Sequence, residues 1–471
     1  MDVTLRALNR FGLGARPGER RLISDPRQWL RQQLRGEPSL PAAPEAASSA
    51  AIAGAVRALR EAGPDRAKRQ EARRRLVAIG VAEGQACLRE RITSARPFVE
   101  RLVGFWSNHL CVSAAAKPQV AALAGSYERE AIRPHVLGRF ADMVLASAKH
   151  PAMLIYLDNF QSIGPGSPGA ASATRGNRTA RGLNENYARE LLELHTLGVD
   201  GGYAQADVVE MARALTGWSV SGLAATGGGA ALGAGGRRRV QNAGASDNGD
   251  VLSFAFRALL HEPGTRTVVG NRYSEDGVTQ GERAIRDVCR HASTARFVAT
   301  KLVTHFVSDT PPSPAVDRVA RVFRETEGDL RAVAGALIDL AEAWAPDVHK
   351  FRTPQDWLVA VSRAFGMQDV DDREVGVLRQ LRHPLWSPPS PKGFGDGLQE
   401  WADPDSLLNR AELARTIAQR PSARAIDPRE LLDAVAVGPA DPVRALLFDT
   451  SIPEPERVAL AIAGPAFQWR S

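Results

Sequence analysis

Gly182-Leu-Asn-Glu-Asn-Tyr-Ala-Arg-Glu-Leu-Leu-Glu-Leu-His-Thr-Leu-Gly198 is the stretch that decides the fold, because it carries both the start and the stop signal of a helix. Asn184 is a good N-cap residue, and Gly198 suits the left-handed position that follows a helix. At 100° per residue, His195 falls on the same apolar face as Leu191. The segment therefore predicts an amphipathic helix with one imidazole in its apolar face.

Helical patterns dominate the chain on both sides of this segment. Pro97 is placed to open one helix, and Pro134 is placed to interrupt the next. Residues 254–256 alternate like a short strand, and residues 267–270 are the expected partner strand of a hairpin. The predicted fold is therefore mostly α, a multi-helix globular array with one short β-hairpin and two glycine-rich insertions, at 161–181 and 222–250.

Length and composition predict how the chain is divided. Its 471 residues are enough for two to three domains. We expect an N-terminal helical segment, a Pro/Ala-rich connector, a helical core that contains the motif, a low-complexity insertion, and a C-terminal helical region packed on the core. Their ranges are 1–35, 36–60, 61–221, 222–250 and 251–471.

The charge pattern argues against a nucleic-acid partner. The formal charge is +7, but lysine occurs only at 68, 117, 149, 301, 350 and 392, and every other basic residue is arginine. Such a bias is typical of genome composition, and no zinc finger or basic strand interleaved with aromatics accompanies it. Because arginine is the usual basic residue of this chain, a lysine indicates a position where a compact ammonium group is preferred over the planar guanidinium group of arginine.

Location and redox state follow from what the sequence lacks. No apolar run reaches the roughly 18 residues of a membrane span, and no basic segment followed by an apolar one precedes residue 20. We therefore expect no membrane span and cytoplasmic residence, with export alongside a signal-bearing partner as the alternative. Three widely spaced cysteines, at 87, 111 and 289, argue against a disulfide framework.

Two histidines define the candidate catalytic site. The helix after Pro97 places His109 in an apolar stripe, as the motif helix does His195. Two interpretations stay open: each imidazole is bonded to backbone or carboxylate within the core, or both line one interior pocket with Asn184, Glu185 or Glu190 as partners. The candidate catalytic residues are His109, His195 and Glu190, and the candidate binding residues are Asn184, Glu185, Asn186, Arg189, Lys117, Lys301 and Trp218.

A metal site within the motif helix is excluded by spacing. Leucines stand three and four residues before His195, where a second ligand would be needed. Any metal would take its ligands from separate helices, so we assign no metal ligand.

A second candidate pair is Lys301 with His305, one helical turn apart at the border of an apolar face. Together they suit an anionic group, and the alternative is a lysine stem that passes along packed aliphatics.

Several motifs resemble the bacterial DUF1800 family over essentially the whole chain. They are Leu8–Gly14, Phe105–Ser113, His150–Asn159, Gly182–Trp218, Ala295–Leu302 and Pro388–Phe394. Members are often encoded beside a DUF1501 protein, from a sulfatase-like family that commonly carries export signals. The resemblance implies an accessory or catalytic partner in extracytoplasmic polymer or saccharide metabolism. The alternatives are a non-enzymatic assembly partner of a DUF1501 protein and a metal-binding protein, and no cofactor is implied.

One departure from the family pattern concerns the helix of His109. The family often has His-Asn-His where this chain has Ser107-Asn108-His109. If both histidines were ligands, this chain would lack one, which weakens a metal-binding interpretation. Lys117, Lys301 and Lys350 do stand where the family tends to have lysine.

Overall fold

The computed structural model describes residues 2–44, 47–175, 182–223, 252–346, 348–420, 426–435 and 441–470. Most of the predicted insertion 222–250, and residues 176–181 of the other glycine-rich stretch, lie outside these ranges.

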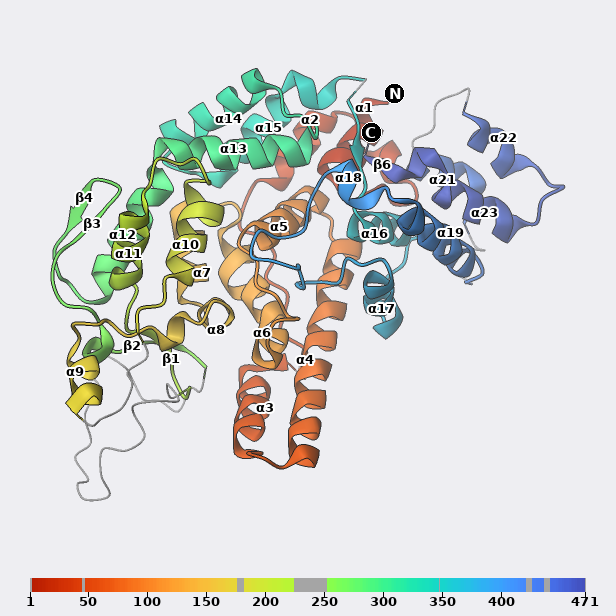
Figure 1. Ribbon diagram of the computed structural model, residues 1–471. Coiled ribbons are helices and arrows are strands. Elements are labelled where there is room, and N and C mark those ends of the chain that lie inside the picture. The colour runs from red at the N-terminus through yellow and green to blue at the C-terminus, as the bar shows by residue number, and fades with distance from the viewer. Residues whose placement is uncertain are drawn as a thin grey trace.

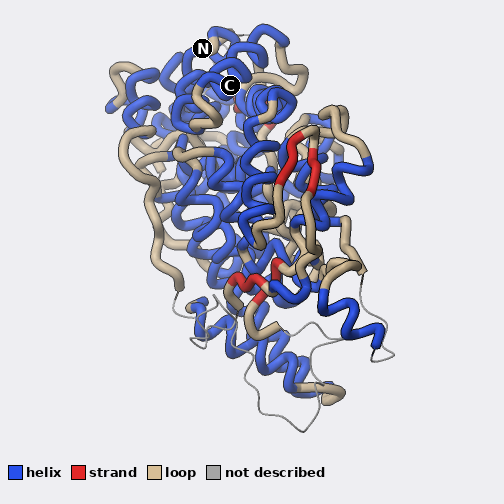
Figure 2. Tube along the Cα trace, turned by 90° about the vertical axis from the view of Figure 1, so that its left-hand side faces the viewer, coloured by secondary structure: helices blue, strands red, loops and turns tan. Residues whose placement is uncertain are grey.

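The described chain is mostly α, as predicted. Helices occupy almost every layer of the molecule, and the few strands are short (Figures 1 and 2). Short 3₁₀ or π segments are labelled η. The first half contains α1 (Val3–Arg6), η1 (Ala7–Phe11), η2 (Glu19–Leu22), α2 (Pro26–Gln33), α3 (Ser49–Glu61), α4 (Arg66–Thr93), α5 (Pro97–His109), α6 (Pro118–Tyr127), η4 (Glu128–Ile132), η5 (Arg133–His135), α7 (Phe140–Lys149), α8 (Pro151–Tyr156), η6 (Asn159–Gln161), α9 (Pro168–Arg175), α10 (Asn186–Glu190), η7 (Leu191–Thr196) and α11 (Gln205–Ala214).

The second half wraps around these elements and ends beside the N-terminus (Figure 1). It contains η8 (Ala258–Leu260), α12 (Val278–Arg290), α13 (Ala292–Phe306), α14 (Ser313–Glu325), α15 (Leu330–Asp339), η9 (Ala341–Trp344), α16 (Pro354–Ala364), α17 (Asp372–Gln380), α18 (Leu398–Trp401), α19 (Pro404–Ala418), α21 (Pro428–Val435), α22 (Pro442–Phe448), α23 (Glu454–Ala463) and η10 (Pro465–Gln468).

Proline positions several of these starts. Pro97 opens α5 as predicted, and the helix that begins at α6 passes into a π turn and then a 3₁₀ turn at Pro134. Both follow from the missing N–H of proline, which is harmless in a first turn and disruptive further along. Within the range predicted as a connector, α3 forms behind the N-cap Ser48 and packs against α4.

The predicted hairpin was wrong in its pairing. Strand β2 (Phe254–Phe256) pairs antiparallel with β1 (Trp218–Val220), and β3 (Arg266–Val268) pairs with β4 (Asn271–Tyr273) across a tight turn. The third pair joins β5 (Lys350–Phe351) to β6 (Trp469–Arg470). The buried Trp218 packs edge-on against Phe254, and such an apolar cross-strand contact is invisible to a search for nearby partners.

The motif helix begins one residue later than predicted. Glu185 takes the N-cap position, while the side-chain oxygen of Asn184 accepts from the Asn186 N–H at 3.0 Å. The last turns are π rather than α, and Gly198 follows with φ +86°, as expected for the residue after a helix. In the next helix, α11, the N-cap is Ala204, and Asp207 in the first turn accepts from the Ala204 N–H.

Two apolar cores meet along the N-terminal segment. Ala7 and Phe11 belong to the core of the central helices and α12–α15, while Leu5 and Leu8 belong to the core of α16–α23. Adjacent positions of one short segment therefore tie both cores together. None of the described helices is long and apolar enough to cross a membrane.

Candidate functional site

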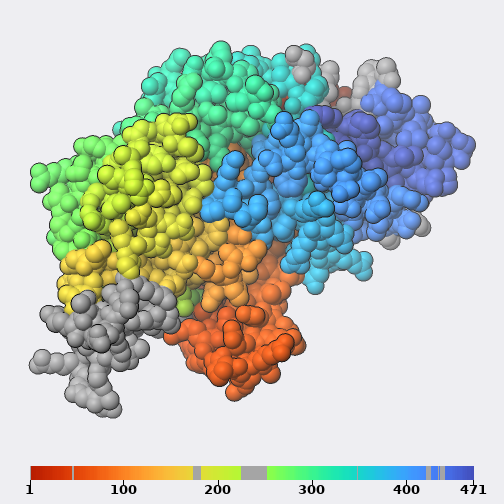
Figure 3. Space-filling model, in the orientation of Figure 1, coloured from red at the N-terminus to blue at the C-terminus, as the bar shows by residue number. Residues whose placement is uncertain are grey.

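A cavity of about 860 Å³ opens where the two cores meet. Its wall includes Phe105 from the first core and Leu13, Val359 and Leu385 from the second. The volume lies within the usual range for small-molecule sites, which prefer such boundaries. In Figure 3 the orange surface of the central helices is visible between the yellow and blue segments.

The loop from His383 to Gly397 forms the front of this cavity, and in Figure 1 it crosses in front of α5 and α6. Asn108 on α5 fixes it, because its side chain donates to the Phe394 carbonyl at 2.9 Å and accepts from the Phe394 N–H at 2.8 Å. Gly393 next to it has φ +87°, and a Cβ there would meet the Asn108 carbonyl oxygen at 2.5 Å. Only glycine lets the loop approach α5 this closely.

Asp356 is the first acidic group of the site. Thr353 caps α16 and Pro354 opens it, which places Asp356 in the first turn. There the helix dipole favours a carboxylate. Arg101 on α5 donates to both carboxylate oxygens at 3.1 and 3.2 Å. Burial alone would raise the pKa of Asp356, but the charges of Arg101 and Arg470 outweigh it and hold that pKa well below the ordinary range.

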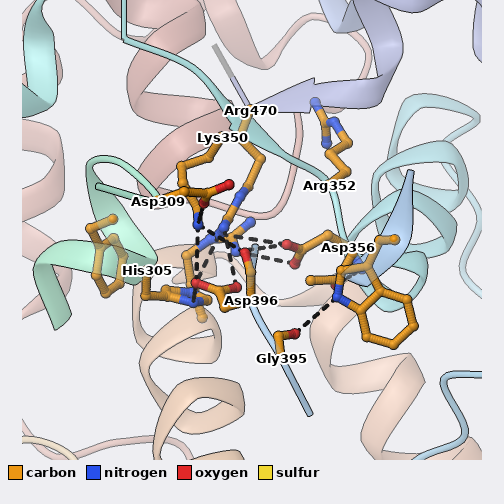
Figure 4. Close-up of polar contacts among 12 residues, drawn as sticks. His305, Asp309, Lys350, Arg352, Asp356, Gly395, Asp396 and Arg470 are labelled. Atoms are coloured by element: carbon orange, nitrogen blue, oxygen red, sulfur yellow. Dashed lines mark hydrogen bonds and ion pairs between the residues drawn. The ribbon is translucent and has the colours of Figure 1, made fainter. Parts of the chain in front are cut away.

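Asp396 is the second, and three elements supply its partners (Figure 4). His305 Nδ1 from the end of α13 lies 3.0 Å from Oδ2, Lys350 Nζ from β5 lies 3.4 Å from Oδ2, and Arg470 Nη2 from β6 lies 3.5 Å from Oδ1. Lys350 also pairs with Asp309. These partners outweigh burial and hold the pKa of Asp396 below its ordinary value.

The contacts of His305 fix its tautomer. Arg470 Nη1 lies 3.3 Å from His305 Nε2, and a guanidinium can only donate. Nε2 is therefore the acceptor, and Nδ1 carries the proton that is donated to Asp396. Burial, helped by the Arg470 charge and opposed by Asp396, lowers the pKa of His305. The imidazole is thus neutral near pH 7, with both nitrogens already engaged.

The cationic groups that face the cavity are paired differently. Arg101 is matched by Asp356, whereas Lys301, Lys392 and Arg379 have no salt bridge to any residue the structure describes. Lys301 is partly buried in the wall with its ammonium 5.5 Å from the Phe297 ring. Burial lowers the pKa of Lys301 to about 8, and the charge of Lys392 adds to that effect.

Aromatic side chains also line the cavity. His383 stacks on Trp401 with ring centroids 4.5 Å apart and meets Phe394 edge-on at 4.3 Å. Burial lowers the pKa of His383 to about 3, so its ring is neutral. Its Nδ1 is buried and has no hydrogen-bond partner among the described residues. A neutral donor or acceptor next to flat apolar rings suits a ligand with both hydroxyl groups and C–H faces.

The predicted catalytic histidines come together behind this cavity. His109 and His195 are each 1% exposed, and His109 Nε2 donates to the His195 carbonyl oxygen at 3.0 Å. Neither side chain lines the cavity. Burial and the nearby charge of Lys301 lower the pKa of both rings, that of His195 to about 3. Lys301 is the predicted residue that connects this pair to the cavity.

The other motif residues lie away from the cavity lining. Glu185 pairs with Arg189 at 3.3 Å, and both bond to Gln205 on α11. Asn184 donates to the Leu157 carbonyl at 3.1 Å. Glu190 is half-buried, and burial raises its pKa. Asn186 is the exposed first residue of α10.

The two remaining binding candidates have structural partners. Lys117 Nζ donates to the carbonyls of Ile155 and Tyr156 at the end of α8 and pairs with Asp158 at 2.8 Å. Trp218 is fully buried in the β1–β2 sheet. Neither reaches the cavity lining.

Sequence reasoning missed Arg101, Asp356, Asp396 and Arg470. The one available signal was the pairing of Lys301 with His305 on a single helix, and both side chains do line the cavity. Lys350, another of the rare lysines, is fully buried. It belongs to the charged cluster of Asp396, His305, Lys350, Asp309 and Arg470. No group of three or more potential metal ligands occurs among the residues that the structure describes.

Comparison with curated proteins and with solved structures found no match. A family model does match, and it covers residues 6–469, which include every side chain of the cavity wall. The chain therefore belongs to the family described as "protein of unknown function (DUF1800)".

Proposed function

We propose that the cavity binds an anionic saccharide or a fragment of an anionic polymer and performs acid–base chemistry on it. The observation that carries the proposal is a surplus of cationic groups in one cavity. Among the described lining residues, Lys301, Lys392, Arg379 and Arg382 have no salt bridge, and Glu400 is the one acid that lacks a partner. The buried acids of the wall are already neutralised, Asp356 by Arg101 and Asp396 by its three partners. An incoming anion would supply the missing negative charge.

The shape and surface of the cavity support a saccharide in particular. A sugar ring offers C–H faces that stack on aromatic side chains and hydroxyl edges that need polar partners. Trp401 and Phe394 supply the faces, and His383 Nδ1 supplies a buried polar atom without a partner. This fits the role in polymer or saccharide metabolism that the family resemblance implies.

Lys301 is the group best placed for proton transfer. With a pKa of about 8, a measurable fraction of its amine is neutral near pH 7. The acid–base role thus falls to Lys301 and not to the predicted catalytic residue His195, which does not line the cavity and is neutral at any physiological pH. His305, with both nitrogens engaged, would position the end of α13 rather than meet the ligand.

Calorimetry with oligoglucuronate and with the matching neutral oligoglucose tests this proposal. We expect binding of the anionic oligomer alone, weakened by added salt. Arg379→Gln and Lys392→Gln should each weaken it roughly two- to five-fold, because both charges are exposed. Arg321→Gln, an exposed arginine on α14, is the matched control. Equal affinity for the neutral oligomer would refute the proposal.

The competing proposal is a non-enzymatic assembly partner of a DUF1501 sulfatase-like protein. It is supported by the exposed apolar side chains Leu408, Phe448 and Leu460 on α19, α22 and α23. Of these helices, α19 and α22 both contact α23. Exposed apolar groups on one module often mark a protein interface. Co-purification with a sulfatase-like neighbour that is lost in Leu408→Ser/Phe448→Ser would favour it, and loss of the complex in Lys301→Met instead would contradict it.

A further inference from the structure

The rare lysines of this chain fall into two groups. Four of the six face a carboxylate: Lys68 with Asp65, Lys117 with Asp158, Lys149 with Glu282, and Lys350 with Asp309 and Asp396. Within the described ranges, Lys301 and Lys392 have no such partner, and both line the same cavity. The two amines without a carboxylate partner among the described residues therefore line the same cavity.

The surroundings of Lys301 keep part of its amine unprotonated. Burial disfavours the ammonium and Lys392 repels it, whereas Cys111 and Asp396 oppose these effects only in part. A desolvated lysine next to a second cation is the arrangement that activates an amine as a nucleophile. Arginine, which this chain uses almost everywhere else, has no such chemistry because it does not lose its proton.

We propose that Lys301 forms a covalent imine with the aldehyde or ketone group of an anionic substrate held in the cavity. This inference rests on the proposed function and names its substrate class, which is an anionic compound with a free carbonyl group. The reducing end of an acidic saccharide and a 2-oxo acid both belong to that class.

The bonds and protons of the step balance without a further reagent. The Nζ lone pair forms a bond to the carbonyl carbon, and the carbonyl π pair moves to oxygen, which takes a proton. The nitrogen then loses a proton, and the hydroxyl leaves as water with a proton from the Lys392 ammonium while the nitrogen lone pair forms the C=N bond. The remaining N–H proton passes to the Lys392 amine, which restores its ammonium. The product is one imine and one water for each amine and carbonyl, with no change in oxidation state.

Reductive trapping tests the imine directly. The intact protein is incubated with pyruvate, the smallest compound that joins a carboxylate to a ketone, and sodium cyanoborohydride at pH 7. Relative to an ordinary exposed lysine, an amine with a pKa near 8 has about 200 times more of its neutral form at that pH. A reduced adduct blocks trypsin at Lys301, so the uncut peptide 297–318 with the added mass should appear in the digest.

One variant should abolish the adduct, and a second variant serves as the control. Lys301→Arg keeps the positive charge but forms no imine, so the adduct should vanish. Lys68→Arg removes an exposed lysine of α4 outside the cavity and should leave trapping at Lys301 unchanged.

The outcomes separate this inference from the proposed function. Wild-type protein that binds oligoglucuronate but gives no adduct on Lys301 would overturn the imine alone. An adduct spread evenly over Lys68 and the other exposed amines would overturn it as well. Absence of both binding and adduct would overturn both proposals, and an adduct confined to Lys301 without oligoglucuronate binding would overturn only the anionic saccharide.

Discussion

Replacing Asp396 with asparagine is the most direct test of the charged cluster in the cavity wall. The amide keeps the size of the side chain but removes the charge that His305, Lys350 and Arg470 share. Lys350 retains Asp309 and the Asp396 carbonyl oxygen, and Arg470 retains Asp356 at 3.5 Å. His305 Nδ1 exchanges a carboxylate for a neutral acceptor.

The size of the effect follows from these distances. Each cation about 3.5 Å from the carboxylate gains about 5 kcal/mol of Coulomb energy at an effective dielectric constant near 20. The desolvation of the carboxylate cancels much of that gain, and breaking a buried ion pair typically costs about 3–5 kcal/mol. Because both cations keep another partner, we expect Asp396→Asn to lower the free energy of unfolding by about 3 kcal/mol.

The measurement is urea unfolding followed by tryptophan fluorescence, with Trp401 near the altered site, since its indole N–H donates to the Gly395 carbonyl at 2.9 Å. Asp200→Asn, an exposed aspartate, is the control. The folded pKa of Asp396 lies below its unfolded value, so its contribution is present above about pH 4 and is lost on acidification. The difference between wild type and variant should therefore shrink below pH 4. A loss no larger than that of the control at pH 7 would refute the assigned role of the cluster.

Three further predictions concern stability. Arg133→Met should lower the free energy of unfolding by about 3–5 kcal/mol, because it leaves Glu100, which is 2% exposed and bonded to Arg133 at 2.6 and 2.9 Å, without its partner. The double variant Glu100→Leu/Arg133→Met should lose less stability, and a double-mutant cycle measured by urea unfolding tests this. The folded pKa of Lys301, about 8, lies below its unfolded value, so wild-type stability should rise by up to about 3 kcal/mol between pH 8 and 10, and Lys301→Met should abolish that rise. Gly393→Ala should lower the free energy of unfolding by about 1–3 kcal/mol, because the new Cβ clashes with Asn108 and the backbone φ is positive. An unchanged thermal unfolding midpoint would contradict the close approach of the loop to α5.

Much of the local structure could be read from the sequence. Pro97 sets the start of α5, because a ring nitrogen without a proton suits a first turn, and Gly198 ends the motif segment through its left-handed backbone. The helical class of the fold follows from the same short-range patterns. The pairing of the strands could not be read from such patterns. A long insertion separates β1 from β2 in the sequence, and its length does not indicate which strand β1 pairs with.

The predicted and the observed residues differ most at the candidate site. Sequence spacing picks out His109 and His195 because each stands in an apolar helical stripe, and the structure brings them into contact but behind the wall of the cavity. Lys301 was found for a different reason, namely that lysine is rare in this chain.

What the sequence determined by itself is local: where helices begin and end, which faces are apolar, and which lysines stand out. Only the tertiary structure decided that Asp396 would meet His305, 91 positions away, and that the penultimate residue Arg470 would meet the same pair. The physical reason is that neighbours along a helix are fixed by its period, whereas buried charges are matched through space. Any carboxylate of the chain is a candidate partner for any cation until packing has brought the two together.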